Sequence, residues 1–429
     1  MNAGFTSLPF LPADILLPQN CDYDKWSVVA CDQYTSQPEY WQRVEERVGR
    51  APSALRLILP ESSLDGPQAE IDIMDINSTM TRYVREGRFK TLPGAMVYVE
   101  RTLSSGRVRR GLVGMADLTA YDYEPGSDAL IRATEGVVMS RIPPRVAVRK
   151  NAPIELPHAM LLADDPQRTV IEPLAAQTGE MELLYDFDLM ERGGHVKGWL
   201  LTQAQLAQVA AALSALADPA AFNARYRTEN QPVMLFAVGD GNHSLATAKE
   251  CYERQKRLMP PEKWDTLPAR YTLCELVNLH DDSLEFEPIH RVVFHTDPEA
   301  LLDALVRAYP GARRGREAEG DGLPLRYVRA GGEGVVTVPA SAARLGVGAL
   351  QSFLDSYLME RQGRVDYIHG EDVAREFAAR PGNIAFLLPP MDKRELFPSV
   401  IHDGVLPRKT FSMGEAHDKR FYLEARKIR

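Results

Sequence analysis

The sequence has few cysteines and no long hydrophobic run. Its four cysteines, Cys21, Cys31, Cys251 and Cys274, include no pair at CxxC spacing, and in 429 residues they are too few to form a disulfide framework. We therefore expect free thiols in a reducing compartment. No stretch approaches the ~18 uninterrupted apolar residues of a membrane-spanning helix. The N-terminus lacks the basic start and apolar core of a signal peptide. These absences predict a cytoplasmic protein without a membrane partner.

An excess of positive charge is also missing. Lys and Arg number 50 against 59 Asp and Glu, which gives a formal net charge of -9. Nucleic-acid-binding domains normally carry a basic patch, so we expect no nucleic-acid partner. The hydrophobic content of 45% and charged content of 25% are those of an ordinary globular protein. The length allows two or three domains at about 100–200 residues each.

Several catalytic motifs are absent as well. The sequence contains neither GxxxxGK[ST] nor GxGxxG, so neither of the nucleotide-binding folds that use these loops is indicated. It has no HExxH zinc motif and no GxSxG nucleophile elbow. A metalloprotease and an α/β-hydrolase therefore have no support.

Hydrophobic periodicity and turn residues predict a mixture of hairpins and strand–helix units, which is typical of an α+β or mixed α/β protein. Helices are expected over residues 37–48, 71–86, 201–217, 244–258, from Asp297-Pro298 onward, and around 350–358. Strands are expected over residues 56–59, 95–103, 108–113, 158–162, 232–238, 325–328, 335–338 and 384–388. The segment 123–170 reads as turn-rich. We divide the chain into an N-terminal α/β segment (1–94), a core (95–296) and a C-terminal α/β subdomain (297–429).

The most informative feature is the turn that follows the buried run 232–238. The turn consists of Gly239, Asp240, Gly241, Asn242, His243 and Ser244. It leads into a helix, whose first N–H groups and positive dipole end favour phosphate, and its glycines allow a ligand to approach the backbone. Asp240 could hold a magnesium ion or a substrate hydroxyl. His243 could donate to a phosphate oxygen, and Ser244 could do so or cap the helix. The pattern alone fits equally well an ordinary strand–helix turn capped by Asp240 or Asn242.

Residues 239–249, Gly-Asp-Gly-Asn-His-Ser-Leu-Ala-Thr-Ala-Lys, resemble the signature of the bacterial domain of unknown function 1015 family. In that family an Asp-Gly-x-His motif lies at a strand-to-helix corner. Segments 26–34, 286–291 and 406–415 are similar to three further blocks of the family. The Asp-Gly-x-His corner also resembles the phosphate motif of ParB/sulfiredoxin-like proteins, which bind nucleotides there and some of which phosphorylate free L-serine.

This wider resemblance implies a mixed-sheet ParB/sulfiredoxin-like core and a site for Mg²⁺ with ATP or ADP. In those kinases an upstream His-Glu pair supplies the catalytic glutamate, and its nearest equivalent here is Glu135. The sequence departs from the pattern in two places. Ala133 and Thr134 stand where the His is expected, and Ser244 replaces the Arg that usually follows the motif His. A more distant cation must therefore supply the missing charge.

Two further residues are candidates for binding phosphate. Arg291 begins an apolar run and could clamp a phosphate with two hydrogen bonds, or it could form a structural ion pair with Glu285 or Glu287. Lys409 lies in a basic turn beside a threonine, and the resembled family block has a Lys-Ser/Thr pair there; a solvated turn is the alternative.

Together with these residues, the resemblance implies a kinase that acts on a small hydroxylated metabolite, with free L-serine as the first candidate acceptor. Asp240 and Glu135 would be catalytic, and Asp240 would also be the metal ligand. The 239–244 turn, Arg291 and Lys409 would hold the nucleotide. Two alternatives remain: a nucleotide- or phosphate-binding protein without catalysis, and an enzyme whose turn holds a phosphorylated substrate. A homodimer is compatible with each of them.

Overall fold

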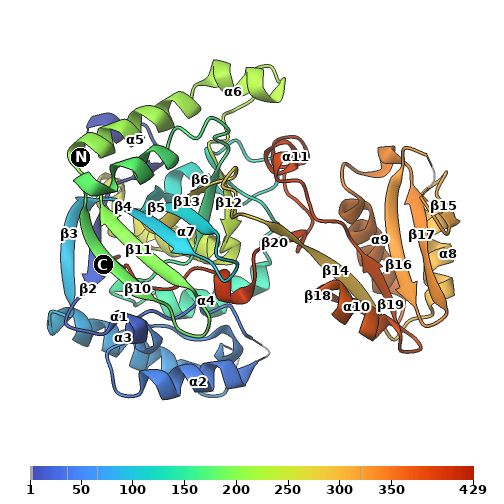
Figure 1. The fold of residues 1–429 in the computed structure, drawn as a ribbon, viewed down its shortest axis with the longest axis horizontal. Helices are drawn as coiled ribbons and strands as arrows, with labels where there is room; N and C mark the ends of the chain where they lie inside the picture. The colour runs from blue at the N-terminus through green and yellow to red at the C-terminus, as the bar shows by residue number, and fades with distance from the viewer. Residues whose placement is uncertain (1–2, 36, 65, 319) are drawn as a thin grey trace. The chain divides into compact units, whose positions relative to one another are not determined.

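The computed structural model describes residues 3–35, 37–64, 66–318 and 320–429, and the chain folds into two compact units (Figure 1). The first unit comprises Met1–Leu284 together with Gly414–Arg429, and the second comprises Glu285–Met413. The chain therefore leaves the first unit, builds the second, and returns to complete the first. Within the described part of the chain, no helix is long and apolar enough to cross a membrane.

A mixed sheet of ten strands forms the centre of the first unit. Its order is β10-β11-β4-β5-β13-β9-β12-β7-β6, and β1 pairs with β5 beside this path. The strands are β1 (Phe10–Leu11), β4 (Val97–Thr102), β5 (Val108–Asp117), β6 (Tyr121–Asp122), β7 (Ile131–Ala133), β9 (Met160–Ala163), β10 (Glu182–Asp188), β11 (His195–Leu200), β12 (Phe236–Asp240) and β13 (Tyr271–Asn278). The antiparallel pair β4–β5 confirms the expected hairpin. The pairs β9–β13, β7–β12 and β6–β7 are parallel, so strand–helix units are joined to hairpins in one sheet.

Helices cover both faces of this sheet. They are α1 (Tyr23–Trp26), α2 (Pro38–Val48), α3 (Ala69–Arg85), α4 (Ile142–Arg149), α5 (Gln203–Leu216), α6 (Pro219–Tyr226) and α7 (Asn242–Arg257). Because side chains alternate along a strand, Val97 and Val99 pack into the core with α2 and α3, whereas Met96 and Tyr98 pack into the core with α5 and α7. Figure 1 shows α2 and α3 on one side of the sheet and α5 on the other.

Two sequence predictions in this unit are wrong. The run 56–59 is not a strand, because Ala54–Leu57 forms a 3₁₀ turn whose N-cap, Ser53, accepts a hydrogen bond from the Leu55 N–H. A short apolar run is compatible with either backbone conformation. The segment 123–170, expected as turns, contains α4. Its two prolines, Pro143 and Pro144, lie in the first helical turn, where a missing N–H costs no hydrogen bond.

The second unit has a smaller sheet, in which all the described strand pairs are antiparallel. Its sheet order is β15-β17-β16-β19-β14-β18, with β20 paired to β14. The elements are β14 (Phe286–Phe294), α8 (Pro298–Ala308), β15 (Arg313–Gly315), β16 (Leu323–Arg329), β17 (Gly332–Val338), α9 (Gly346–Glu360), β18 (Arg364–His369), α10 (Glu371–Ala378), β19 (Ile384–Leu387), α11 (Leu396–Asp403) and β20 (Phe411–Met413). Val293 packs with α8 and α9, and Val292 packs with α10, so this sheet is also covered on both faces. The predicted N-cap of α8 is confirmed, since Asp297 accepts from the Glu299 and Ala300 N–H groups.

The C-terminal segment is threaded into the first unit. Two small sheets, β2 (Ala13–Pro18) with β3 (Phe89–Ala95) and β8 (Ile154–Glu155) with β21 (Arg426–Lys427), flank the main sheet. Single bridges join Phe421 to Val29 and Ala425 to Leu16. The residues after Gly414 therefore pair with both early and middle parts of the chain.

A buried carboxylate, Glu155, fixes the last strand. Its side chain is 3% exposed. It accepts from the Leu273 N–H (2.9 Å) and from Arg426 Nε (2.8 Å), and it also pairs with Arg149. Burial opposes ionisation, but the two arginines and the Leu273 N–H together lower the pKa of Glu155 to about 2. One carboxylate thereby ties β8, β13, β21 and the end of α4 together.

We expect Glu155→Gln to destabilise the first unit and to flatten its response to acid. The folded pKa lies below the ordinary value of 4.5, so the contribution of Glu155 is present above that pH and is lost as the pH falls toward 2. Removing one partner of a buried ion pair costs about 3–5 kcal/mol near neutral pH. The measurement is urea unfolding followed by tryptophan fluorescence between pH 2 and 7. All four tryptophans, Trp26, Trp41, Trp199 and Trp264, belong to the first unit. The exposed Glu180→Gln is the control, and an unchanged acid profile in Glu155→Gln would contradict this role.

Candidate functional site

The predicted strand–helix corner is present at the end of β12. Strand β12 runs to Asp240, and α7 begins at Asn242. Between them Gly241 is the N-cap and adopts the left-handed conformation (φ 78°). A Cβ atom at Gly241 would lie 2.9 Å from Ala159 Cα, closer than side chains are found to backbone atoms. Both the backbone angle and the neighbouring backbone thus require glycine, and the turn is tight.

The corner is held to the end of β7. Thr134 follows β7, the parallel neighbour of β12, and is 1% exposed. Its N–H donates to Asn242 Oδ1 (3.3 Å), the Asn242 amide donates to Thr134 Oγ1 (3.3 Å), and that hydroxyl donates to the Val238 carbonyl (2.7 Å). The ends of parallel strands meet at the same edge of a sheet, so Asn242 fastens the first turn of α7 to the chain beside it.

His243 makes a second connection to the same segment. The Val138 N–H donates to His243 Nε2 (3.2 Å). A neutral imidazole that accepts at Nε2 carries its proton on Nδ1. Thr134 and Val138, one before and one after the half-buried Glu135, are therefore both bonded to the corner. The structure brings the Glu135 segment and the 239–244 turn together, which sequence reasoning could only assume.

Lys419 is the residue at this corner that sequence reasoning missed. Its Nζ lies 3.2 Å from Asp240 Oδ2, and the other carboxylate oxygen of Asp240 accepts from the Gly241 N–H (2.9 Å). The Lys419 side chain is only 9% exposed, against 22% for Asp240. A largely buried cation therefore lies at the N-terminal end of α7, in a motif where Ser244 replaces the usual arginine. The pair is separated by 179 residues, so no local pattern could have indicated it.

Asp32, His158 and Tyr422 extend the polar group. The Tyr422 hydroxyl is bonded to His158 Nδ1 (2.8 Å) and accepts from the Cys31 N–H (3.1 Å). Burial opposes ionisation of Asp32, but His158, the Gln33 amide and Lys419 together lower its pKa below the ordinary value. Asp32 is thus a second carboxylate whose negative charge interacts with the positive charge of Lys419. The available signal was the resemblance of segment 26–34 to a family block, which contains Asp32.

The fit of Mg²⁺ to this corner depends on Asp240. Among the described residues, no group of three or more His, Cys, Asp or Glu side chains could hold a metal ion. Nucleotide-bound Mg²⁺ commonly takes only one or two protein carboxylates and receives its other ligands from phosphates and water. Asp240 suits this smaller role as a single carboxylate at the mouth of the turn.

Arg291 and Lys409 belong to the second unit. Arg291 is fully buried, and its guanidinium donates to the carbonyls of Ile289 (2.6 Å), Arg408 (2.8 Å) and Lys409 (2.9 Å). Lys409 is exposed and has a left-handed backbone (φ 56°). Arg291 therefore holds the backbone of the turn that presents Lys409. The phosphate-binding roles of both residues stay predictions.

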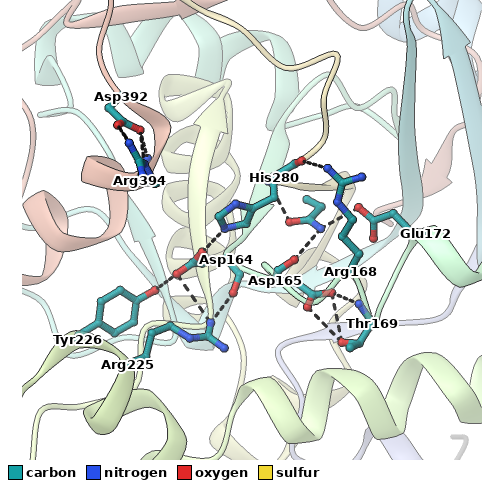
Figure 2. Close-up of polar contacts among 11 residues, drawn as sticks. Asp164, Asp165, Arg168, Thr169, Glu172, Arg225, Tyr226, His280, Asp392 and Arg394 are labelled. Atoms are coloured by element: carbon teal, nitrogen blue, oxygen red, sulfur yellow. Dashed lines mark hydrogen bonds and ion pairs between the residues drawn. The ribbon is translucent and has the colours of Figure 1, made fainter.

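A second polar cluster lies at the other edge of the main sheet (Figure 2). His280 Nε2 is bonded to Asp164 Oδ1 (2.6 Å), and Tyr226 and Arg225 also contact Asp164. Burial opposes ionisation of Asp164, but His280, Tyr226 and Arg225 lower its pKa. In the register of β12 on β9, Phe236 pairs with Ala163 and Asp240 pairs with Met160, so Asp164 and Asp240 are at opposite ends of these strands. This cluster ties α6 to the ends of β9 and β13 and is separate from the corner.

Comparisons with solved structures give only weak likenesses. A free serine kinase variant in complex with AMP is 11% identical with a TM-score of 0.41, covering 75% of this chain and 93% of that chain. A conserved hypothetical protein from Pyrococcus furiosus is 10% identical (TM-score 0.36; 72% and 90% covered). SbnI with a C-terminal truncation, from Staphylococcus aureus, is 8% identical (TM-score 0.37; 70% and 82% covered). At these values the likeness is too weak to establish fold or activity. No curated protein matches the chain.

A family match covers most of the sequence. The family described as Protein of unknown function (DUF1015) matches residues 15–362. That range includes Glu135, the 239–244 turn and Arg291, whereas Lys409 and Lys419 lie beyond it. Because the match spans well over half of the chain and includes the Asp-Gly-x-His corner, this protein belongs to the DUF1015 family.

Proposed function

We propose that the protein is a nucleotide-dependent kinase that phosphorylates a hydroxyl group of a small metabolite, with free L-serine as the first acceptor to test. The observation that carries this proposal is the buried Lys419 beside Asp240 at the N-terminal end of α7, next to the Glu135 segment. In this proposal the N-terminal end of α7 would bind phosphate, Asp240 would be the metal ligand and Glu135 would be the base.

Charge decides whether the corner can hold a polyphosphate. A helix N-terminus alone favours an anion by only about 0.3–1 kcal/mol at an exposed site. An ammonium group that is mostly removed from water interacts more strongly, because it is less screened. Lys419 therefore takes the part of the missing motif arginine. His243, with its proton on Nδ1, would donate to a phosphate oxygen.

The proposed reaction is an in-line phosphoryl transfer. The acceptor oxygen attacks the terminal phosphorus, its proton passes to Glu135, and the nucleotide leaves with one phosphate fewer. Bound Mg²⁺ would neutralise charge on the phosphate oxygens, with Asp240 as its protein ligand. Lys419 would stabilise the charge that develops between donor and acceptor. A contribution from Arg291 and Lys409 stays a prediction.

We further propose that the first unit has a ParB/sulfiredoxin-like core, that ATP or ADP is the phosphate donor, and that the protein is cytoplasmic and forms a homodimer. The structure has two compact units. The division of the sequence into the three segments 1–94, 95–296 and 297–429 stays a prediction.

A second candidate function has its own support. Asp240 already neutralises Lys419, and Ala133-Thr134 replaces the His of the kinase pattern. A nucleotide- or phosphate-binding protein without catalysis fits these two facts.

We expect nucleotide binding to depend on Lys419. Thermal shifts of the full chain are measured with ATP, ADP, CTP and GTP, each with and without Mg²⁺. A ligand at a hundredfold excess over its Kd stabilises by ~2.7 kcal/mol. Lys419→Met should weaken binding of the preferred nucleotide about tenfold or more, a loss of ~1.4 kcal/mol. Lys263→Met, an exposed lysine, is the matched control. Equal shifts in both variants would remove Lys419 from the site.

We expect Glu135→Gln to separate binding from turnover. With the preferred nucleotide and a metabolite mixture that contains L-serine, phosphorylated product is followed by ³¹P NMR. Loss of a general base lowers kcat about 10²–10⁴-fold while the thermal shift with nucleotide persists. Wild-type activity in Glu135→Gln would show that Glu135 is not the base. Nucleotide binding by the wild type without consumption of any nucleotide would favour the non-catalytic alternative.

A further inference from the structure

A small polar cavity lies beneath the C-terminal segment, apart from the corner. Its volume of about 20 Å³ is enough for one water molecule or one small ion. The charged side chains that line it are Arg101, Arg109, Arg420, Glu275 and Glu424. They come from β4, β5 and β13 and from the chain's last segment. All five are at least nine-tenths buried, with exposed fractions between 1% and 5%.

Among the side chains that line this cavity, positive charge is in excess. Three arginines face two glutamates, and Arg420 pairs with both Glu424 (2.6 Å) and Glu275. Arg109 Nε lies 3.6 Å from Glu275 Oε1. The next carboxylate, Asp418, is turned toward Ser104, whose N–H and hydroxyl both donate to it (3.0 and 3.1 Å). The two glutamates are therefore the ion-pair partners of Arg420 and Arg109.

Arg101 is the cation without a carboxylate of its own in the cavity wall. One of its terminal nitrogens donates to the carbonyls of Gly193 and His417, and its guanidinium lies over the Phe421 ring, 4.8 Å from the centroid. Its Nε is buried and has no hydrogen-bond partner among the described residues. Burial, with Arg109 as the second cause, lowers the pKa of Arg101 to about 9, although the charges of Asp418 and Glu275 act in the opposite direction.

The unpaired atoms indicate a missing negative charge. Arg109 Nε and Glu275 Oε1 also lack hydrogen-bond partners within the described chain, but a small approach would pair them with each other. Within the described ranges, Arg101 Nε has no carboxylate at ion-pair distance, and an unpaired buried charged donor is costly. A water molecule would satisfy the N–H and leave the excess charge in place. A phosphate or carboxylate ion exceeds the space of a single water.

We propose that this cavity binds a monovalent anion of the size of chloride, with Arg101 as its principal ligand. The anion would join β4 and β5 of the sheet to the segment that carries Arg420. It would therefore stabilise the docking of the last segment, independently of any nucleotide at the corner.

The test compares halides with a large anion. Unfolding is followed by tryptophan fluorescence in sodium chloride, sodium bromide and sodium gluconate at equal ionic strength. We expect chloride and bromide, and not gluconate, to raise the unfolding temperature saturably by about 2 °C or more. Arg101→Met should lose this dependence, whereas Arg85→Met, an exposed arginine at the end of α3, should retain it.

A crystallographic measurement covers the case in which Arg101→Met does not fold. Crystals of the wild type grown in bromide should show an anomalous peak within hydrogen-bonding distance of Arg101 Nε. Either a water molecule in the cavity without anomalous signal or the same stability in all three salts would overturn the proposal.

Discussion

Buried pairing of the arginines of the last segment with Glu155 of β8 and Glu275 of β13 is the interaction on which the rest of the first unit depends. Arg426 is bonded to Glu155, and Arg420 is paired with Glu275 and Glu424. Each of these groups loses its hydration, which costs several kcal/mol per ion unless a partner is well placed. A shift of the segment by one residue would leave charges unpaired on both sides. The pairing therefore sets the register of the segment, and this register places Lys419 against Asp240.

Pairing of buried charges also determines what the candidate site can bind. Asp240 and Lys419 neutralise each other at the turn, and Asn242 is occupied in holding the turn to Thr134. A polyphosphate that binds there has to share Lys419 with Asp240, and a divalent cation beside Asp240 would lower the cost of that sharing. Polyphosphate binding should thus depend on a divalent cation that binds with it, rather than on the N-terminal end of α7 alone. The polar cluster at Asp164 shows the contrast, because its carboxylate is satisfied by His280, Tyr226 and Arg225 at the opposite end of the strands.

Local patterns predicted the corner, and long-range pairing explains what they missed. Two glycines between a buried strand and an amphipathic helix are sufficient to indicate the turn at Gly239–Ser244, and the β4–β5 hairpin and the α8 cap are equally local. Helix α4 was missed because its paired prolines suggest a turn unless they fall in the first helical turn. The nearness of Glu135 follows from the parallel pairing of β7 with β12, which no window of sequence contains. The bonds of Arg291 to the carbonyls of Arg408 and Lys409 join residues more than 100 positions apart, so no local pattern could indicate them, and its phosphate-binding role stays a prediction.

The discontinuity of the first unit has a consequence for the order of events during synthesis. The second unit, Glu285–Met413, is contiguous, so all of its strands have been synthesised before Lys419 is translated. The first unit has by then the strands of its main sheet, but Glu155 still lacks Arg426 and Glu275 still lacks Arg420. Until the last segment docks, these two carboxylates would therefore be compensated only in part, by Arg149 and Arg109. The corner at Asp240 would acquire its lysine only after the ribosome had passed the insert, so phosphate binding there would report on completed translation of the returning segment.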